Sequence, residues 1–391
     1  MGYSFIIPFY IHWLNPYPLV NKILLFISLF IIFLIYVANP SLILNNNGLI
    51  IIILYYLSLF FSNYINASLN LSYLLSLILS IGFALLLGYA ILNKNELLSL
   101  LLALKILIYL YALLNIILIF IYPEGIPSVL QERGSQYYLF GNVNASIRFL
   151  LPGLLFSMLY DVLKKDKVGK GSWLLLIITW ITLIKTWAVT AMFGLFFYSV
   201  IILLNMKKTK VYFAYIGALI GSIIMTVFLV FFKIESNLLA EILLYFEKDL
   251  TFSSRDVLWM NAVDTIKQSI IWGYGDLDSD ELEYFIGNRY GSHNYYLDIL
   301  LRGGIVSASI LLVGLLYMSA KVIRSKGSFI TNLLVASSGA YFVMWMAEPF
   351  IATEYLMFSI LFVLMSQINR LEKYYLNRIE SNNQLGAIND N

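Results

Sequence analysis

The stretch LLSLLLALKILIYLYALLNIILIFIY, residues 97–122, contains Lys105 as its single charged side chain. A helix crosses a bilayer in about 20 apolar residues, because only a helix or a closed barrel satisfies its backbone hydrogen bonds in hydrocarbon. The stretch therefore predicts a membrane-spanning helix. Lys105 falls in the half that we expect to face the cytoplasm, where its long side chain can reach the interface, so a structural role is favoured.

Other runs of the same kind occur along the whole chain. The first twenty residues are also apolar but are broken by Pro8, Pro16 and Pro18, which fits a short span or an interfacial segment. The sequence thus predicts an all-α integral membrane protein with eleven or twelve transmembrane helices. Besides 97–122, the predicted spans are 22–44, 49–67, 69–92, 146–163, 173–184, 187–204, 212–232, 304–323, 329–347 and 350–368.

Composition agrees with this class of protein. Of 391 residues, 61% are hydrophobic and 12% are charged, and the mean hydropathy is +0.83. A water-soluble protein of this size needs more charge to cover its surface. The net charge of +3, with no long basic run, argues against a nucleic-acid partner. The chain has no Cys, so disulfides and thiolate metal sites are excluded.

The distribution of Lys and Arg predicts the orientation, since cytoplasmic loops are enriched in them. Four clusters mark the cytoplasmic side: 164–170, 207–210, 321–326 and the tail. The loop 233–303, with six Lys or Arg against twelve Asp or Glu, then faces outside. The expected parts are an N-terminal helix bundle, an extracytoplasmic loop domain, C-terminal helices and a cytoplasmic tail, at 1–232, 233–303, 304–368 and 369–391.

The outer loop is the longest polar segment. Residues 234–250 carry an apolar stripe that predicts a helix on the membrane surface. A second helix is expected from Ser253, which has capping-box spacing to Asp256, and to end before Gly273. The acidic run DLDSDELE at 276–283 does not match a calcium loop, because Glu281 stands where Gly is needed and Gly287 where the bidentate Glu is needed. It is expected to be a solvated loop.

Chemistry is expected where this loop meets the membrane, because Arg255, Arg289, His293 and Arg302 all lie in or near it. Arg presents a fixed fork of donors that matches a phosphate, and His is easily poised to take a proton near neutral pH. A lipid-linked pyrophosphate with a hydroxyl acceptor would suit such a set.

Further polar residues are expected near the outer face. Arg148 and Lys185 are either interfacial anchors or functional cations, with neither reading favoured. Glu348 and Glu354 flank a short outer turn and are candidates for binding sugar hydroxyls. The Tyr and Trp residues near span ends are expected mostly to form an interfacial belt, with Tyr295 and Tyr296 as candidates for stacking on sugar rings, and His12 is expected to be interfacial.

Five segments, in order, carry a resemblance: GNVNAS at 141–146, TLIKTWAVTAMFGL at 182–195, SRDVLWMNAV at 254–263, GYG at 273–275 and SHNYYLDILLRGGI at 292–305. Over about residues 95–325 the chain resembles the O-antigen polymerase and ligase superfamily, specifically a Wzy-type polysaccharide polymerase. It departs from that pattern at Ala188, where Ser is frequent, and in GNVN, where Pro commonly precedes the second Asn.

The resemblance implies an inverting, metal-independent glycosyl transfer with no cofactor, on the outer face of the bacterial cytoplasmic membrane. The donor would be a glycan on undecaprenyl pyrophosphate, and the acceptor a hydroxyl of a further lipid-linked repeat unit. Arg255 would bind the pyrophosphate, and His293 would orient or deprotonate the acceptor. Partners would be membrane lipids, a flippase and a chain-length regulator. The cations expected to stabilise the leaving group are Arg133, Arg148, Lys185, Arg255, Arg289 and Arg302.

Two alternatives stay open. An O-antigen ligase that transfers finished glycan to a lipid A core uses the same chemistry with another acceptor. A flippase for lipid-linked oligosaccharides would be expected to show internal repeats and polar groups near the bilayer midplane. The sequence shows no repeat between its halves, and its polar groups gather in one outer loop, which favours an enzyme.

Overall fold

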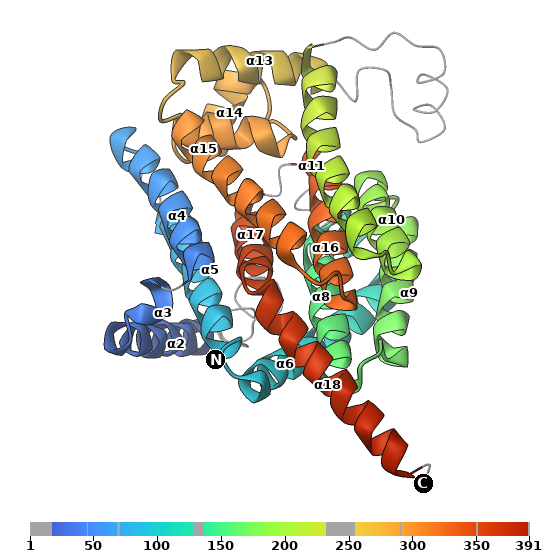
Figure 1. The fold of residues 1–391 in the computed structure, drawn as a ribbon. Helices are drawn as coiled ribbons and strands as arrows, with labels where there is room; N and C mark the ends of the chain where they lie inside the picture. Colours follow the sequence, from blue (N-terminus) through green and yellow to red (C-terminus); the bar gives the residue numbers. More distant parts are fainter. Residues whose placement is uncertain are drawn as a thin grey trace.

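The computed structural model describes residues 18–44, 46–68, 71–127, 136–231, 255–289, 291–348 and 351–389. These residues form an almost wholly helical protein (Figure 1). One short hairpin, β1 (Tyr137–Tyr138) with β2 (Gly141–Asn142), leads into the 3-10 turn η1 (Val143–Ala145). The helices are α2 (Pro18–Ala38), α3 (Ser41–Leu44), α4 (Asn47–Ile65), α5 (Leu71–Ala90), α6 (Lys94–Ile121), α8 (Ser146–Lys165), α9 (Lys170–Lys185), α10 (Val189–Leu204), α11 (Lys208–Phe231), α13 (Arg255–Gln268), α14 (Ser279–Ile286), α15 (Tyr295–Arg324), α16 (Phe329–Trp345), α17 (Ile351–Ser366) and α18 (Ile368–Asn389).

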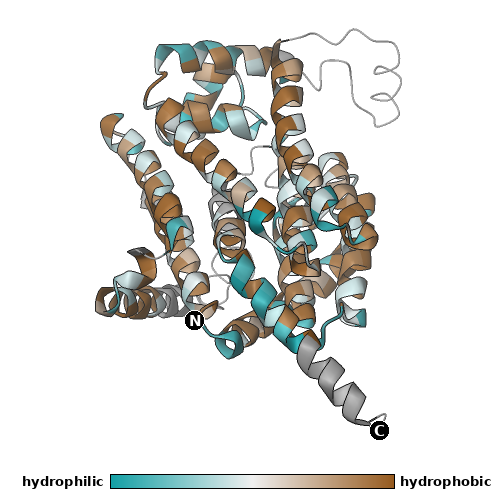
Figure 2. Ribbon diagram, viewed as in Figure 1, coloured by the Kyte–Doolittle hydropathy of each residue, from teal (hydrophilic) through white to brown (hydrophobic). Residues whose placement is uncertain are grey.

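Every predicted span except 22–44 overlaps one of these helices, so the chain is an all-α integral membrane protein. Within the described ranges, six helices are long and apolar enough to cross a membrane: those at Asn47–Ile65, Tyr73–Ala90, Lys94–Ile121, Val143–Lys165, Lys208–Phe231 and Tyr295–Arg324. The two short predicted spans 173–184 and 187–204 form a hairpin of helices, α9 and α10, joined by a short turn. Figure 2 shows apolar residues along most of the bundle and polar ones on α13, α14 and α18.

Two buried helices hold the bundle together. Along α8 every residue from Phe149 to Leu163 is buried, and α16 is buried over most of its length. Around them pack α6, α9, α10 and α11, while α4, α5, α15 and α17 form the other side of the bundle. Large apolar side chains cover much of the outside, among them Phe213 at 69% exposure and Leu203 at 68%. Exposed apolar surface of this extent marks a face that contacts a membrane or another protein.

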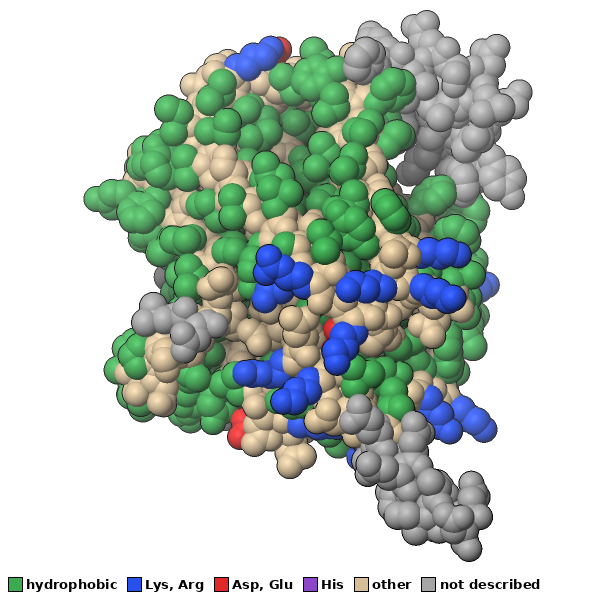
Figure 3. Space-filling view, in the orientation of Figure 1, with side chains coloured by type: hydrophobic (Ala, Val, Ile, Leu, Met, Phe, Trp, Pro, Cys, Tyr) green, Lys and Arg blue, Asp and Glu red, His purple; other side chains and the backbone are tan. Residues whose placement is uncertain are grey.

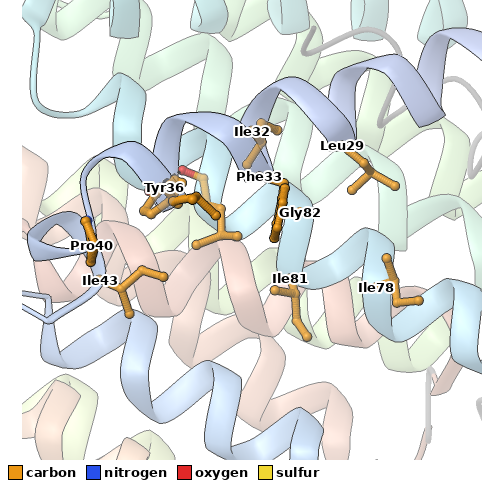
Figure 4. Close-up of a pocket in the computed structure, with 11 residues that line it drawn as sticks. Leu29, Ile32, Phe33, Tyr36, Pro40, Ile43, Ile78, Ile81 and Gly82 are labelled. Carbon is orange, nitrogen blue, oxygen red and sulfur yellow. Dashed lines mark hydrogen bonds between the residues drawn. The ribbon is translucent and has the colours of Figure 1, made fainter.

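The predicted span 22–44 is wrong as one continuous helix. It breaks at Asn39–Pro40, because Pro has no backbone N–H for the helix ladder. The first part, α2, lies across the lower ends of α4 and α5 in Figure 1 instead of running beside them. Between α2, α3 and α5 lies a cavity of about 750 Å³ lined almost wholly by apolar side chains such as Ile32, Phe33 and Ile81 (Figure 4).

Lys105 does not snorkel to the interface. Its Nζ lies 2.6 Å from Oδ1 of Asp161 on α8, and Asp161 is nearly fully buried. The other carboxylate oxygen accepts the N–H of Gly169 at 3.0 Å and the hydroxyl of Ser172 at 2.6 Å. The pair therefore ties α6, α8 and the turn before α9 together, which gives Lys105 the structural role that was favoured.

The basic clusters gather away from α13 and α14. The turn between α8 and α9, the start of α11 and the turn between α15 and α16 carry the clusters 164–170, 207–210 and 321–326. Figure 3 shows one face of the molecule, on which most Lys and Arg side chains lie in the lower half. Helices α13 and α14 lie at the top in the same orientation (Figure 1). This asymmetry is the one that the positive-inside rule uses to assign orientation.

In the loop 233–303, the structure corrects the prediction for the acidic run at 276–283. The acidic run is not an irregular loop, because most of it forms α14. Asp278 caps this helix in a full capping box with Glu281. The surface helix expected at 234–250 and the start expected at Ser253 lie outside the described residues, and α13 is described from Arg255.

Candidate functional site

Helix α15 has an unusual start and an interruption. Helix α15 begins at Tyr295, well before the expected residue 304, and Asn294 caps it by accepting the N–H of Leu297. The helix is interrupted at Gly304, whose φ of 59° and ψ of −164° are not helical. A Cβ at this position would lie 2.2 Å from the carbonyl oxygen of Ile271, so only Gly fits.

The WGYGD loop, residues 272–276, fills this interruption. The N–H groups of Tyr274 and Gly275 donate to the carbonyls of Leu301 and Arg302, at 2.7 and 2.9 Å. Arg302 also forms an ion pair with Asp276, whose pKa is raised by burial although the guanidinium beside it opposes that shift. Arg302 is therefore an anchor between the loop and α15.

Eleven residues before that break, His293 adopts a left-handed backbone conformation with φ of 51°, which is uncommon for a non-Gly residue. Its neighbours fix this conformation. The N–H of Ser292 donates to Oδ1 of buried Asp298 at 2.9 Å, and the Ser292 hydroxyl donates to the carbonyl of Asn294 at 2.8 Å. The indole N–H of Trp259 donates to the Ser292 carbonyl at 2.9 Å. Backbone strain held in this way is characteristic of functional sites.

Arg255, at the start of α13, faces the turn that follows α16. Its Nη1 donates to the carbonyl of Ala347 at 2.6 Å, and its Nη2 lies 3.6 Å from Oε1 of Glu348. The side chain of Asn294 donates to the carbonyl of Met346 at 3.0 Å, so the same turn is bound to the start of α15. Segments far apart in sequence thus meet at one place.

Glu348 lies at the centre of this place. Its Oε1 accepts a hydrogen bond from Nδ2 of Asn144 at 3.1 Å, and its Oε2 lies 3.9 Å from Nδ1 of His293. Burial alone would raise the pKa of Glu348, but interaction with His293 and the charges of Arg255 and Arg148 outweigh it and lower the pKa. The carboxylate is therefore ionised at neutral pH although it is almost completely buried.

We call Asn144, Arg148, Arg255, His293 and Glu348 the outer cluster, after the side of the membrane on which the sequence predicts it. It combines a guanidinium fork, an imidazole and a buried carboxylate in a partly open position: the side chains of Arg255 and His293 are 20% and 22% exposed, that of Glu348 only 6%. Such a set is able to hold an anion and to accept a proton from a hydroxyl.

Four other predicted site residues lie apart from this cluster or have other partners. Arg289 is exposed and pairs with Asp280 and Glu283 near α14. Lys185 is exposed at the end of α9, 5.4 Å from the ring centre of Phe120. Arg302 belongs to the WGYGD anchor. Tyr295 is buried and stacks on Trp345 at 4.3 Å, so its position does not favour stacking on a sugar.

Of the remaining predicted residues, only Tyr296 has a described side chain. Tyr296 is half-buried and its hydroxyl lies 2.6 Å from that of Ser222. Arg133, His12 and the side chain of Glu354 lie outside the described residues. Sequence reasoning assigned no role to Asn144 or Asp298, although both belong to motifs that it singled out, GNVNAS and SHNYYLD.

These features define a class: a polytopic all-α membrane protein with a charged cluster at the end of the bundle that carries α13 and α14. Residues 171–313 match the family model described as O-antigen ligase. This match confirms the resemblance to the O-antigen polymerase and ligase superfamily, and it includes Arg255 and His293. No curated protein and no solved structure gives a significant match.

Proposed function

We propose that this chain is a polysaccharide polymerase that joins undecaprenyl-pyrophosphate-linked repeat units on the outer face of the bacterial cytoplasmic membrane. One observation carries the proposal. Arg255 and His293, named from sequence as the pyrophosphate ligand and the acceptor base, converge on the same carboxylate, Glu348, at 3.6 and 3.9 Å. The family match and the basic clusters at the far side of the bundle support the reaction class and the orientation.

In the proposed reaction, Arg255 and Arg148 hold the pyrophosphate of the donor. His293 takes the proton from the acceptor hydroxyl as its oxygen forms a bond to the anomeric carbon. The bond from that carbon to the phosphate oxygen breaks on the opposite face, and undecaprenyl pyrophosphate leaves with the electron pair. Configuration is inverted, and one proton passes from acceptor to imidazole. Guanidinium groups stabilise the charge on the leaving group, which is the task a metal ion performs in other phosphate sites.

The second candidate is a ligase that transfers finished glycan to a lipid A core. The family match favours it equally, because the matching model is described as O-antigen ligase. A flippase is less well supported, since the described outer cluster lies at one end of the bundle and not at mid-depth.

The test uses purified protein in lipid nanodiscs with one lipid-linked repeat unit as the sole substrate. A polymerase gives a ladder of products that differ by one repeat, and undecaprenyl pyrophosphate is released in step. Product that appears only when lipid A core is added would establish the ligase instead. Movement of the substrate between leaflets with no new glycosidic bond would refute both enzymes.

A further inference from the structure

Three side chains of the outer cluster, those of Asn144, Arg255 and His293, face one buried carboxylate, that of Glu348. Oε1 of Glu348 is 3.1 Å from Nδ2 of Asn144 and 3.6 Å from Nη2 of Arg255, and its Oε2 is 3.9 Å from Nδ1 of His293. The two oxygens therefore serve different partners: one faces the amide and the guanidinium, the other the imidazole.

The contacts to the two basic groups are loose. At 3.6 and 3.9 Å they exceed hydrogen-bond distance, whereas Arg255 holds the carbonyl of Ala347 at 2.6 Å. Nδ1 of His293 is buried and has no hydrogen-bond partner among the described residues. Glu348 faces both groups without a hydrogen bond to either, so a phosphate oxygen that accepts such a bond can replace it at a small cost in free energy.

The depth of the groups sets the order in which a ligand meets them. Arg255 and His293 are about one-fifth exposed, and Glu348 lies beneath them at 6%. A pyrophosphate that approaches from outside meets the guanidinium first and then comes against the carboxylate. The pyrophosphate and the Glu348 carboxylate repel each other strongly if both bind Arg255 in a partly desolvated site. The carboxylate therefore moves away from Arg255.

We propose that Glu348 is a placeholder anion, which the donor pyrophosphate displaces from Arg255 and which then closes on Nδ1 of His293. The inference rests on the proposed function, because it assigns a pyrophosphate to this site. A hydrogen bond from Nδ1–H to Oε2 fixes the imidazole tautomer in which Nε2 carries the free lone pair. Donor binding thereby prepares the base, and the acceptor is activated only when a donor is present.

This role differs from two simpler ones. A carboxylate that binds sugar hydroxyls, as expected from the sequence, has no effect on the affinity for pyrophosphate. A carboxylate that holds Arg255 in place as a fixed ion pair supports phosphate binding, and its loss weakens the affinity. A placeholder competes with phosphate, so its loss strengthens the affinity while turnover falls. The sign of the change separates the three.

The test measures binding of inorganic pyrophosphate to full-length protein in nanodiscs by calorimetry. Glu348→Gln removes the competing charge and keeps the size of the side chain; we expect about tenfold or more tighter binding and, with repeat units, a turnover lower by about 10²-fold or more. The matched control is Asp264→Asn, on the exposed face of α13 beside Lys267, which should change neither quantity. Unchanged or weaker binding by Glu348→Gln overturns the proposal.

A second measurement needs no variant at the site. The chain has two His, so ¹⁵N-histidine signals are simple to assign with a His12→Gln reference. Adding pyrophosphate should shift His293 to the single tautomer with Nδ1 protonated, and an imidazole that does not respond overturns the proposal even if Glu348→Gln fails to fold. A wild-type protein that makes no polymer would refute the proposed function, whereas both binding results would still decide the placeholder role.

Discussion

Replacing Arg255 with Lys tests whether the guanidinium fork matters or only its charge. The structure gives Arg255 two nitrogens with separate tasks: Nη1 binds the carbonyl of Ala347 at 2.6 Å, and Nη2 faces Glu348 at 3.6 Å. A Lys has one nitrogen, so it can hold either the Ala347 carbonyl or the donor phosphate that replaces Glu348, but not both. The loss of one charge-assisted hydrogen bond costs about 1.5–3 kcal/mol, which is about ten- to 150-fold in turnover.

Arg289→Lys is the matched control, because it makes the same change in the same outer loop. Arg289 is 57% exposed and pairs with Glu283 and Asp280 away from the outer cluster. Exposed ion pairs contribute about 0–1 kcal/mol, so activity should stay within about threefold of wild type. The assay is the initial rate of polymer formation in nanodiscs, with protein inserted to the same level. Near-normal activity of Arg255→Lys, or an equal loss in both variants, would refute the role of the fork.

Three other results are expected. Activity should survive thorough chelation with EDTA, because Arg side chains take the role of a metal; loss that magnesium restores would contradict this. Cysteines placed at Tyr284, which is 84% exposed, and at Lys167, in the turn between α8 and α9, should label from opposite sides of intact cells, and an impermeant reagent reaching both would reverse the orientation. Either Lys105→Met or Asp161→Leu alone should destabilise the fold by about 3–5 kcal/mol and the double variant by less than the sum; additive losses in thermal unfolding would show that the pair is not coupled.

The spans were predictable because hydrophobicity is a local property of the chain. Apolar length located most of the spanning helices within a few residues, for instance 146–163 against Ser146–Lys165. The errors have physical causes. Pro40 divides the first span, and α15 starts at Tyr295 since Asn294 caps it, although the polar residues after it hide the helix from a hydropathy scan. The spacing of Asp278 and Glu281 predicts a capping box and hence the start of α14. The density of acidic residues around them favours a solvated loop instead, and this prediction was wrong.

The candidate site was predictable only in part, because it depends on contacts between distant segments. Arg255 and His293 were named from residue type and resemblance, and the structure brings them to a common partner. The contact between Asn144 and Glu348 could not be predicted from local sequence, because the two residues are 204 positions apart. Asn144 lies just before α8, and Glu348 lies just after α16. Arg289 was predicted to bind pyrophosphate because of its charge alone. Its ion pairs with Asp280 and Glu283 depend on helix α14, which was not predicted.

The rate of polymerisation by His293 variants tests the central claim most directly. A positioned general base contributes on the order of 10²–10⁴-fold in rate, so His293→Ala should insert and fold normally but polymerise slower by about that factor. His293→Gln should be equally slow, because an amide cannot accept the proton, and cells with either variant should accumulate single repeat units. If the His293→Gln variant polymerises much faster than the His293→Ala variant, then His293 only orients the acceptor. A wild-type rate from His293→Ala would contradict the assignment of the outer cluster as the site of glycosyl transfer.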